Sequence, residues 1–157
     1  AGPGSRADLQ SRAFEGAPSM AETLILDSEA VNALAYAAKR GVLAERARAI
    51  LTIAHEKRAL VRVPAPVLSE VCRGSRYDSA INRLLNARGI GVSDLTRSIA
   101  QRAGHLLARV KLSSAHAIDA FVVATALQFD TAIIATSDPN DIQRLASPFR
   151  HVRVFAL

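Results

Sequence analysis

The sequence predicts an α/β fold in which a parallel sheet is covered by helices. Short apolar runs, typical of buried strands, alternate with longer segments that carry apolar residues at helical spacing. Such alternation favours parallel strands joined by right-handed helical crossovers. The chain has 157 residues, of which 50% are hydrophobic and 22% charged, values that fit one folded domain.

The predicted strands are short apolar runs bounded by acids, prolines or turn residues. They cover residues 23–27, 60–63, 90–92, 131–135 and 152–155. Asp27 closes the first strand. Pro64 must end the second, because proline cannot donate a hydrogen bond to a neighbouring strand. Asp94 helps to close the third, which is the weakest candidate of the five.

Between these strands, apolar residues recur with the period of a helix. The first predicted helix starts at Ser28 and is interrupted by Gly41, and the others cover residues 44–58, 67–72, 78–87, 97–110, 117–129 and 142–145. Ser28 and Thr96 are candidate N-caps, and Pro66 suits a first helical turn. Residues 137–141 are rich in turn formers, which predicts a turn before the last helix.

Residues 1–19 are left out of this fold prediction. They contain Gly, Ser and Pro, lack the apolar centre of a signal peptide and precede Met20. We interpret them as a vector-derived or disordered leader before a single domain, residues 20–157; a native arm is the alternative. No apolar run reaches the roughly 20 residues that cross a bilayer. A single cysteine, Cys72, excludes an internal disulfide and suits the reducing cytoplasm, although release from the cell stays open.

The charge balance is basic. Lysine and arginine number 20 and aspartate and glutamate 14, which gives a net charge of +6. A basic surface attracts polyanions such as nucleic acids whatever their sequence. The alternative is a solvated surface that only keeps the protein soluble, and charge alone does not decide between the two.

Four acids occur where a parallel sheet places its ligands, at or just after the carboxyl ends of strands. Asp27 closes the first predicted strand, Glu70 lies on the helix after the second, and Asp138 follows the fourth. Asp119 sits near the start of the most apolar helix, on a face that its neighbours should partly bury. A carboxylate in such surroundings is costly unless it is paired, hydrogen-bonded or bound to a metal.

Each acid taken alone has a simpler explanation, as a helix cap or as a first-turn acid favoured by the helix dipole. Gathered together, however, carboxylates raise one another's pKa, so that a cation should compensate them. Oxygen ligands favour hard cations, which predicts Mg²⁺ or Mn²⁺, as one ion or two. Such ions activate water and stabilise the charge that develops on a phosphodiester during hydrolysis.

Four short motifs carry these acids in a characteristic order and spacing. They are Leu26-Asp27-Ser28, Leu68-Ser69-Glu70-Val71, Ile118-Asp119-Ala120 and Thr136-Ser137-Asp138-Pro139-Asn140-Asp141. In this order they resemble the PIN domains, and within that family the VapC-type toxins of bacterial toxin–antitoxin pairs. The resemblance extends from Thr23 to Leu157.

The resemblance implies a three-layer sandwich with a central parallel sheet of strand order 3-2-1-4-5. It also implies a homodimer, Mg²⁺- or Mn²⁺-dependent endoribonuclease activity, and a VapB-type antitoxin that inserts into the active-site groove. The RNA could be transfer, ribosomal or messenger RNA. A non-catalytic PIN-like module that binds RNA or a partner is the alternative function.

By motif match, the catalytic and metal-ligating positions of the family fall on Asp27, Glu70, Asp119 and Asp138. Asp141 is a second candidate for the fourth position; the alternatives are an outer residue that supports the metal ligands and a helix cap. Thr136 and Ser137 match positions where the family often has a hydroxyl that orients water or a carboxylate.

Three further residues are candidates from the sequence. Arg73 and Arg76 flank a Gly-Ser break and are candidates for contact with RNA phosphates or with a carboxylate of the antitoxin; an ordinary solvated loop is the alternative. His116 stands three residues before Asp119 and could share its helix face. Its spacing fits no zinc motif, so we interpret it as a surface histidine.

Overall fold

A five-stranded sheet forms the centre of the computed structural model, which describes residues 22–87 and 89–157. Its strands are β1 (Glu22–Leu26), β2 (Leu60–Pro64), β3 (Ile90–Ser93), β4 (Thr131–Thr136) and β5 (Val152–Ala156). Their order is β3-β2-β1-β4-β5, and every neighbouring pair is parallel. The predicted fold class and strand order are therefore confirmed, while the predicted leader lies outside the described residues.

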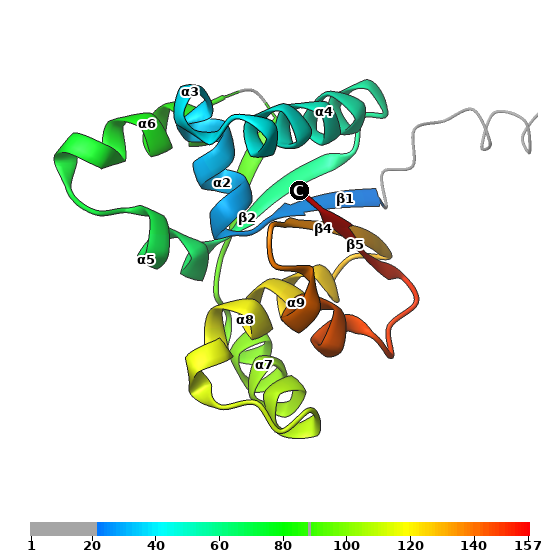
Figure 1. The fold of residues 1–157 in the computed structure, drawn as a ribbon. Coiled ribbons are helices and arrows are strands. Elements are labelled where there is room, and N and C mark those ends of the chain that lie inside the picture. Colours follow the sequence, from blue (N-terminus) through cyan, green and yellow to red (C-terminus); the bar gives the residue numbers. More distant parts are fainter. Residues whose placement is uncertain (1–21, 88) are drawn as a thin grey trace, which may run out of the picture.

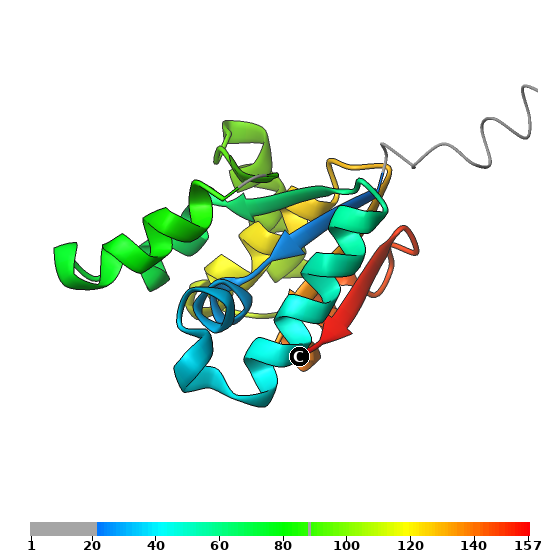
Figure 2. The ribbon, with the colours of Figure 1, turned by 90° about the horizontal axis from the view of Figure 1, so that it is seen from above.

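Helices cover both faces of this sheet (Figures 1 and 2). One face carries α2 (Ser28–Ala35), α3 (Ala37–Arg40) and α4 (Val42–Glu56), with α6 (Ser75–Leu85) beyond them. The other face carries α7 (Arg97–Arg109), α8 (Ala117–Ala126) and α9 (Pro139–Ala146). The short helices η1 (Ala65–Val67) and α5 (Leu68–Val71) follow β2, and η2 (Ser114–His116) leads into α8. In the part of the chain that the structure describes, no helix is both long and apolar enough to cross a membrane.

The core is aliphatic and centres on β1 and α8. Because β1 is the middle strand and has helices on both faces, residues 23–26 are all buried, as expected for an unbroken apolar run. Helix α8 buries Val122 and Val123 completely, together with most of its alanines. The end of β1 and the start of α8 are thus held on well-packed elements.

The predicted and observed elements differ mainly at their ends. Helix α9 begins at Pro139, so part of the predicted turn over residues 137–141 is its first helical turn. Proline suits that position because its fixed φ is already helical and its missing N–H would have no helical partner. Helix α6 begins at Ser75 rather than at 78, since Gly74 adopts a φ of 105° and lets the chain turn just before it. Helix α8 ends at Ala126 rather than at 129.

Candidate metal centre

Asp27 lies directly after β1, at the middle of the sheet's carboxyl edge. It is the N-cap of α2, and its Oδ1 accepts a hydrogen bond of 2.9 Å from the backbone N–H of Ala30. The residue is 8% exposed. Asp27 therefore caps α2, whereas Ser28, which was predicted as a candidate N-cap, is the first residue of the helix.

Ser28 instead connects α2 to the second acidic position. Its Oγ donates a hydrogen bond of 2.6 Å to Oε1 of Glu70, which is exposed on α5. The residue number separation of 42 shows that this contact depends on the tertiary fold. This hydrogen bond holds the side chain of Glu70 beside Ser28, the residue next to Asp27. This positioning role of Ser28 was not predicted from the sequence.

Thr136, the last residue of β4, joins Asp27 to the fourth acidic motif. It is 1% exposed, and its Oγ1 accepts a hydrogen bond of 3.0 Å from the backbone N–H of Asp138. Its hydroxyl also hydrogen-bonds to the carboxylate of Asp27, which lowers the pKa of that acid against the opposing effect of burial. Ser137 follows it and is half-buried.

Substituting Thr136→Val should destabilise the protein by about 1–3 kcal/mol, because it leaves the buried Asp27 carboxylate and the Asp138 N–H each without one hydrogen bond. The free energy of unfolding measured by urea denaturation with a chelator present tests this. Thr23→Val is the matched control. Thr23 is fully buried, and its Oγ1 has no hydrogen-bond partner among the described residues, so its loss should cost little or even stabilise. Equal costs for the two substitutions would contradict the bridging role of Thr136.

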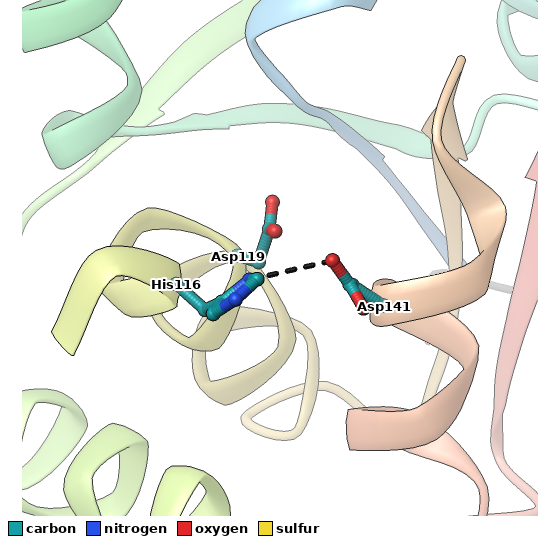
Figure 3. Close-up of side chains that lie close together, drawn as sticks. All are labelled: His116, Asp119 and Asp141. Carbon is teal, nitrogen blue, oxygen red and sulfur yellow. Dashed lines mark ion pairs between the residues drawn. The ribbon is translucent and has the colours of Figure 1, made fainter. Parts of the chain in front are cut away.

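On the other side of the sheet edge, three potential metal ligands lie close together (Figure 3). They are His116 at the end of η2, Asp119 on the first turn of α8 and Asp141 on the first turn of α9. One donor atom from each lies within 4.8 Å of the other two. Nδ1 of His116 is 3.3 Å from Oδ2 of Asp141, and Nη1 of Arg144 is 3.9 Å from Oδ1 of the same carboxylate.

Electrostatics show that the acids from the two sides influence one another. The pKa of Asp119 is raised, first by burial and then by the charges of Asp141, Asp138 and Glu70, while His116 lowers it. Burial raises the pKa of Asp27 from its ordinary 3.8 to about 6, and the charge of Asp119 adds to the rise. The fold therefore brings all the acids that the sequence singled out into one electrostatic unit.

The fourth motif supplies its two acids in different ways. Asp141 is half-buried and belongs to the close group with Asp119, whereas Asp138 is exposed and acts on Asp119 through its charge. The sequence favoured Asp138 because it is nearer to the strand end. Because α9 begins at Pro139, Asp141 lies on its first turn and close to Asp119. The start of this helix was predicted at residue 142, so this position of Asp141 was missed.

His116 was interpreted from the sequence as a surface histidine. The structure places its side chain, 34% exposed, against Asp141 and near Asp119. The available signal was its position three residues before Asp119, since residues three apart share a helix face. The other partner, Asp141, lies 25 residues along the chain, and only the packing of α8 against α9 brings it near.

The two candidate arginines differ in their surroundings. Arg73 lines a groove of about 360 Å³ between α2, α5 and α6, whose lining also includes Glu70 and Tyr77. Nε of Arg73 donates a hydrogen bond of 3.1 Å to the backbone carbonyl of Glu70. Arg76 is exposed on α6 and is not part of this lining. Arg73 therefore shares this groove with Glu70 of the acidic site, whereas Arg76 does not.

The residues present fit a divalent cation. Ligands on opposite sides of an octahedral ion with bonds of about 2.1 Å lie about 4.2 Å apart, so small side-chain rotations would bring the donors of His116, Asp119 and Asp141 to one ion. Among the described residues, the ion pairs at the acidic site involve Asp141 alone. Burial is the main cause of the raised pKa of Asp27 and of Asp119, and the charges of neighbouring acids raise both values further. A cation bound here would favour the ionised form of both carboxylates.

Comparison with known proteins relates this chain to one protein family. Residues 24–148 match the family model of the PIN domain. No curated protein matches the sequence. A chain of VapBC2 from Rickettsia felis, in a crystal structure bound to a DNA fragment from its promoter, is similar with a TM-score of 0.58 and 11% identity, over 85% of this chain and 98% of that one. A chain of a toxin–antitoxin complex from Klebsiella pneumoniae has a TM-score of 0.57 and 16% identity, over 85% and 99%. At these identities the two structures share its fold, and the family match over residues 24–148 shows that this chain belongs to the PIN-domain family.

Proposed function

We propose that this protein is a divalent-metal-dependent endoribonuclease, the VapC-type toxin of a toxin–antitoxin pair. The observation that carries the proposal is the convergence of five carboxylates at the carboxyl edge of a PIN-family sheet. Burial raises the pKa of Asp119 and of Asp27, and the charges of neighbouring acids raise both values further. A purely structural role does not explain such a gathering, because repulsion between like charges costs stability. A bound cation would neutralise this repulsion, so the carboxylates together would attract it strongly.

In this proposal Asp119 and Asp141 hold the ion, with Asp27 completing the oxygen ligands from the end of β1. A divalent ion in such a site lowers the pKa of water and neutralises the charge that grows on a phosphodiester. Glu70, oriented by the hydroxyl of Ser28, and the exposed Asp138 lie at the rim, where they orient water or hold a second ion. Thr136 keeps Asp27 in place through its hydrogen bond.

The proposed substrate is RNA, and the proposed partner is a VapB-type antitoxin. The net charge of +6 supports a polyanionic substrate, since basic side chains outside the acidic site can hold the phosphate backbone. Arg73, beside Glu70 in the groove, is placed to contact an RNA phosphate or an antitoxin carboxylate. Both structural relatives come from toxin–antitoxin assemblies, which supports the partner class. A homodimer in the cytoplasm is part of the same proposal.

Metal dependence of RNA cleavage tests this function. Purified protein, stripped with a chelator, should leave a structured RNA mixture intact and should cut it when Mg²⁺ or Mn²⁺ is added back. Cleavage that continues in the chelator would contradict the proposed mechanism. Metal binding without cleavage of any RNA class, measured by calorimetry on the same preparation, would favour a non-catalytic binding module instead.

A further inference from the structure

The imidazole of His116 adds a nitrogen donor to a site that is otherwise built from oxygen. Figure 3 shows His116 at the end of η2, Asp119 on the first turn of α8, and Asp141 facing them from α9. The nitrogen nearest Asp141 is Nδ1, at 3.3 Å from Oδ2. The three donor atoms together lie within 4.8 Å of one another. This arrangement has the composition of a mixed nitrogen and oxygen metal site.

Local structure holds His116 in this position. Ser113 caps η2 with its side chain, which accepts a hydrogen bond of 3.3 Å from the backbone N–H of Ala115. The backbone N–H of His116 donates to the carbonyl of Ser113 at 3.1 Å. Since His116 and Asp119 are three residues apart at a helix start, they project from the same face. The backbone therefore directs the imidazole of His116 toward the site, so the position of this ring does not depend on its contact with Asp141 alone.

The carboxylate of Asp141 is shared between two basic groups. His116 lies at Oδ2, and Arg144 lies at Oδ1 with its Nη1 at 3.9 Å. Nη2 of Arg144 also donates a hydrogen bond of 3.3 Å to the backbone carbonyl of Val110, which holds the guanidinium in this place. Arginine cannot become a metal ligand, whereas a neutral imidazole with its proton on Nε2 presents the lone pair of Nδ1 to the site.

We infer that His116 is a metal ligand that makes this site select Mn²⁺ over Mg²⁺. The inference rests on the proposed function, whose metal-binding acids it extends. Carboxylate and water ligands serve Mg²⁺ well, while imidazole nitrogen suits first-row transition ions. A site of carboxylates alone would discriminate little between the two ions. The replacement of one oxygen by the His116 nitrogen favours the transition ion.

Two measurements without RNA test this inference. In calorimetric titrations of the chelator-stripped full-length chain, Mn²⁺ should bind the wild type at least about tenfold more tightly than Mg²⁺. His116→Gln should weaken Mn²⁺ binding by on the order of tenfold or more, since the loss even of outer ligand contacts costs 10- to 100-fold in affinity, and should change Mg²⁺ binding little. His105→Gln is the matched control, because His105 is an exposed histidine on α7 that does not belong to the group of potential ligands.

Pulsed electron paramagnetic resonance of the Mn²⁺-loaded wild type provides the second measurement and does not require that a variant folds. Coupling of Mn²⁺ to a ¹⁴N nucleus is expected in the wild type and in His105→Gln, and should be absent in His116→Gln. Absence of ¹⁴N coupling in the wild type, an unchanged Mn²⁺ to Mg²⁺ affinity ratio in His116→Gln, or no Mn²⁺ binding at all would each overturn the inference. A selective Mn²⁺ site in a protein that cuts no RNA would leave this inference standing while the proposed ribonuclease function fails.

Discussion

Asp119→Asn is expected to lower the rate of RNA cleavage by about 100- to 1000-fold. Metal stabilisation of a transition state is worth several kcal/mol, and each 1.36 kcal/mol corresponds to a factor of ten in rate. Asp119 lies within the electrostatic reach of Asp141, Asp138 and Glu70, and its donor atom belongs to the close group with His116. The side-chain amide of the asparagine would bind the ion more weakly than the carboxylate does, while the side-chain volume would stay nearly the same. Initial rates on one labelled RNA at saturating Mn²⁺ measure the effect.

The matched control for this substitution is Asp130→Asn. Asp130 is an exposed acid just before β4, at the opposite end of that strand from the site. The Asp130→Asn variant should cut RNA at the wild-type rate. Asp119→Asn should also remain folded, because the substitution removes repulsion between carboxylates rather than a core contact, and circular dichroism can check this. A folded Asp119→Asn variant that cuts at the wild-type rate would remove Asp119 from the proposed mechanism.

Asp27→Asn should stabilise the metal-free protein at neutral pH by up to about 3 kcal/mol. Burial raises the pKa of Asp27 from 3.8 to about 6, so ionising it in the folded state at pH 7 costs about 3 kcal/mol relative to the unfolded chain. Asparagine carries no charge and can still accept the hydrogen bond from the N–H of Ala30, since it is a good N-cap residue. Urea denaturation with a chelator present measures the difference.

The pH dependence of this gain has a definite sign. A carboxylate whose pKa is higher in the folded than in the unfolded state binds its proton more tightly when folded, so wild-type stability falls as the pH rises from about 3.8 to about 6. Below pH 3.8 Asp27 is protonated in both states. The advantage of Asp27→Asn should therefore be full above pH 6, shrink between the two values and be absent in more acidic solution.

Two comparisons make this prediction specific. Asp130→Asn should leave the free energy of unfolding unchanged to within about 0.5 kcal/mol, as is usual for a surface substitution. Added Mg²⁺ or Mn²⁺ should raise the stability of the wild type and raise that of Asp27→Asn much less, because ligand binding to the folded state stabilises it by mass action. A variant that is less stable than the wild type in chelator at pH 7 would contradict the raised pKa of Asp27.

The fold could be predicted from the sequence because its central elements are strongly patterned. The runs around Leu24 and Ile134 are apolar throughout, as buried parallel strands require, and α7 carries its apolar residues at helical spacing. Helix ends were harder to predict. Pro139 can belong to a turn or to the first turn of a helix, and local sequence does not distinguish these two roles.

The site could be predicted only in part, for a related reason. Asp27, Glu70 and Asp119 follow strand ends or helix starts, which a linear pattern can locate. The contacts of His116 with Asp141 and of Ser28 with Glu70 join residues 25 and 42 positions apart, so they arise from the packing of separate elements. The placement of Asp141 depends in addition on where α9 begins. Sequence alone left the choice between Asp138 and Asp141 open because it did not locate that helix start.

The chemistry of the RNA ends tests most directly the claim that these carboxylates hold a cation which activates water. If water is the nucleophile, each cut yields a phosphate monoester on one end and a hydroxyl on the other, with no 2′,3′-cyclic phosphate. End sequencing and mass spectrometry of one RNA, cut in Mn²⁺ by the wild type and by Asp27→Asn, should show such ends for the wild type and no cuts at those positions for the variant. Cyclic phosphate ends from the wild type, or the same cuts by Asp27→Asn, would contradict the account.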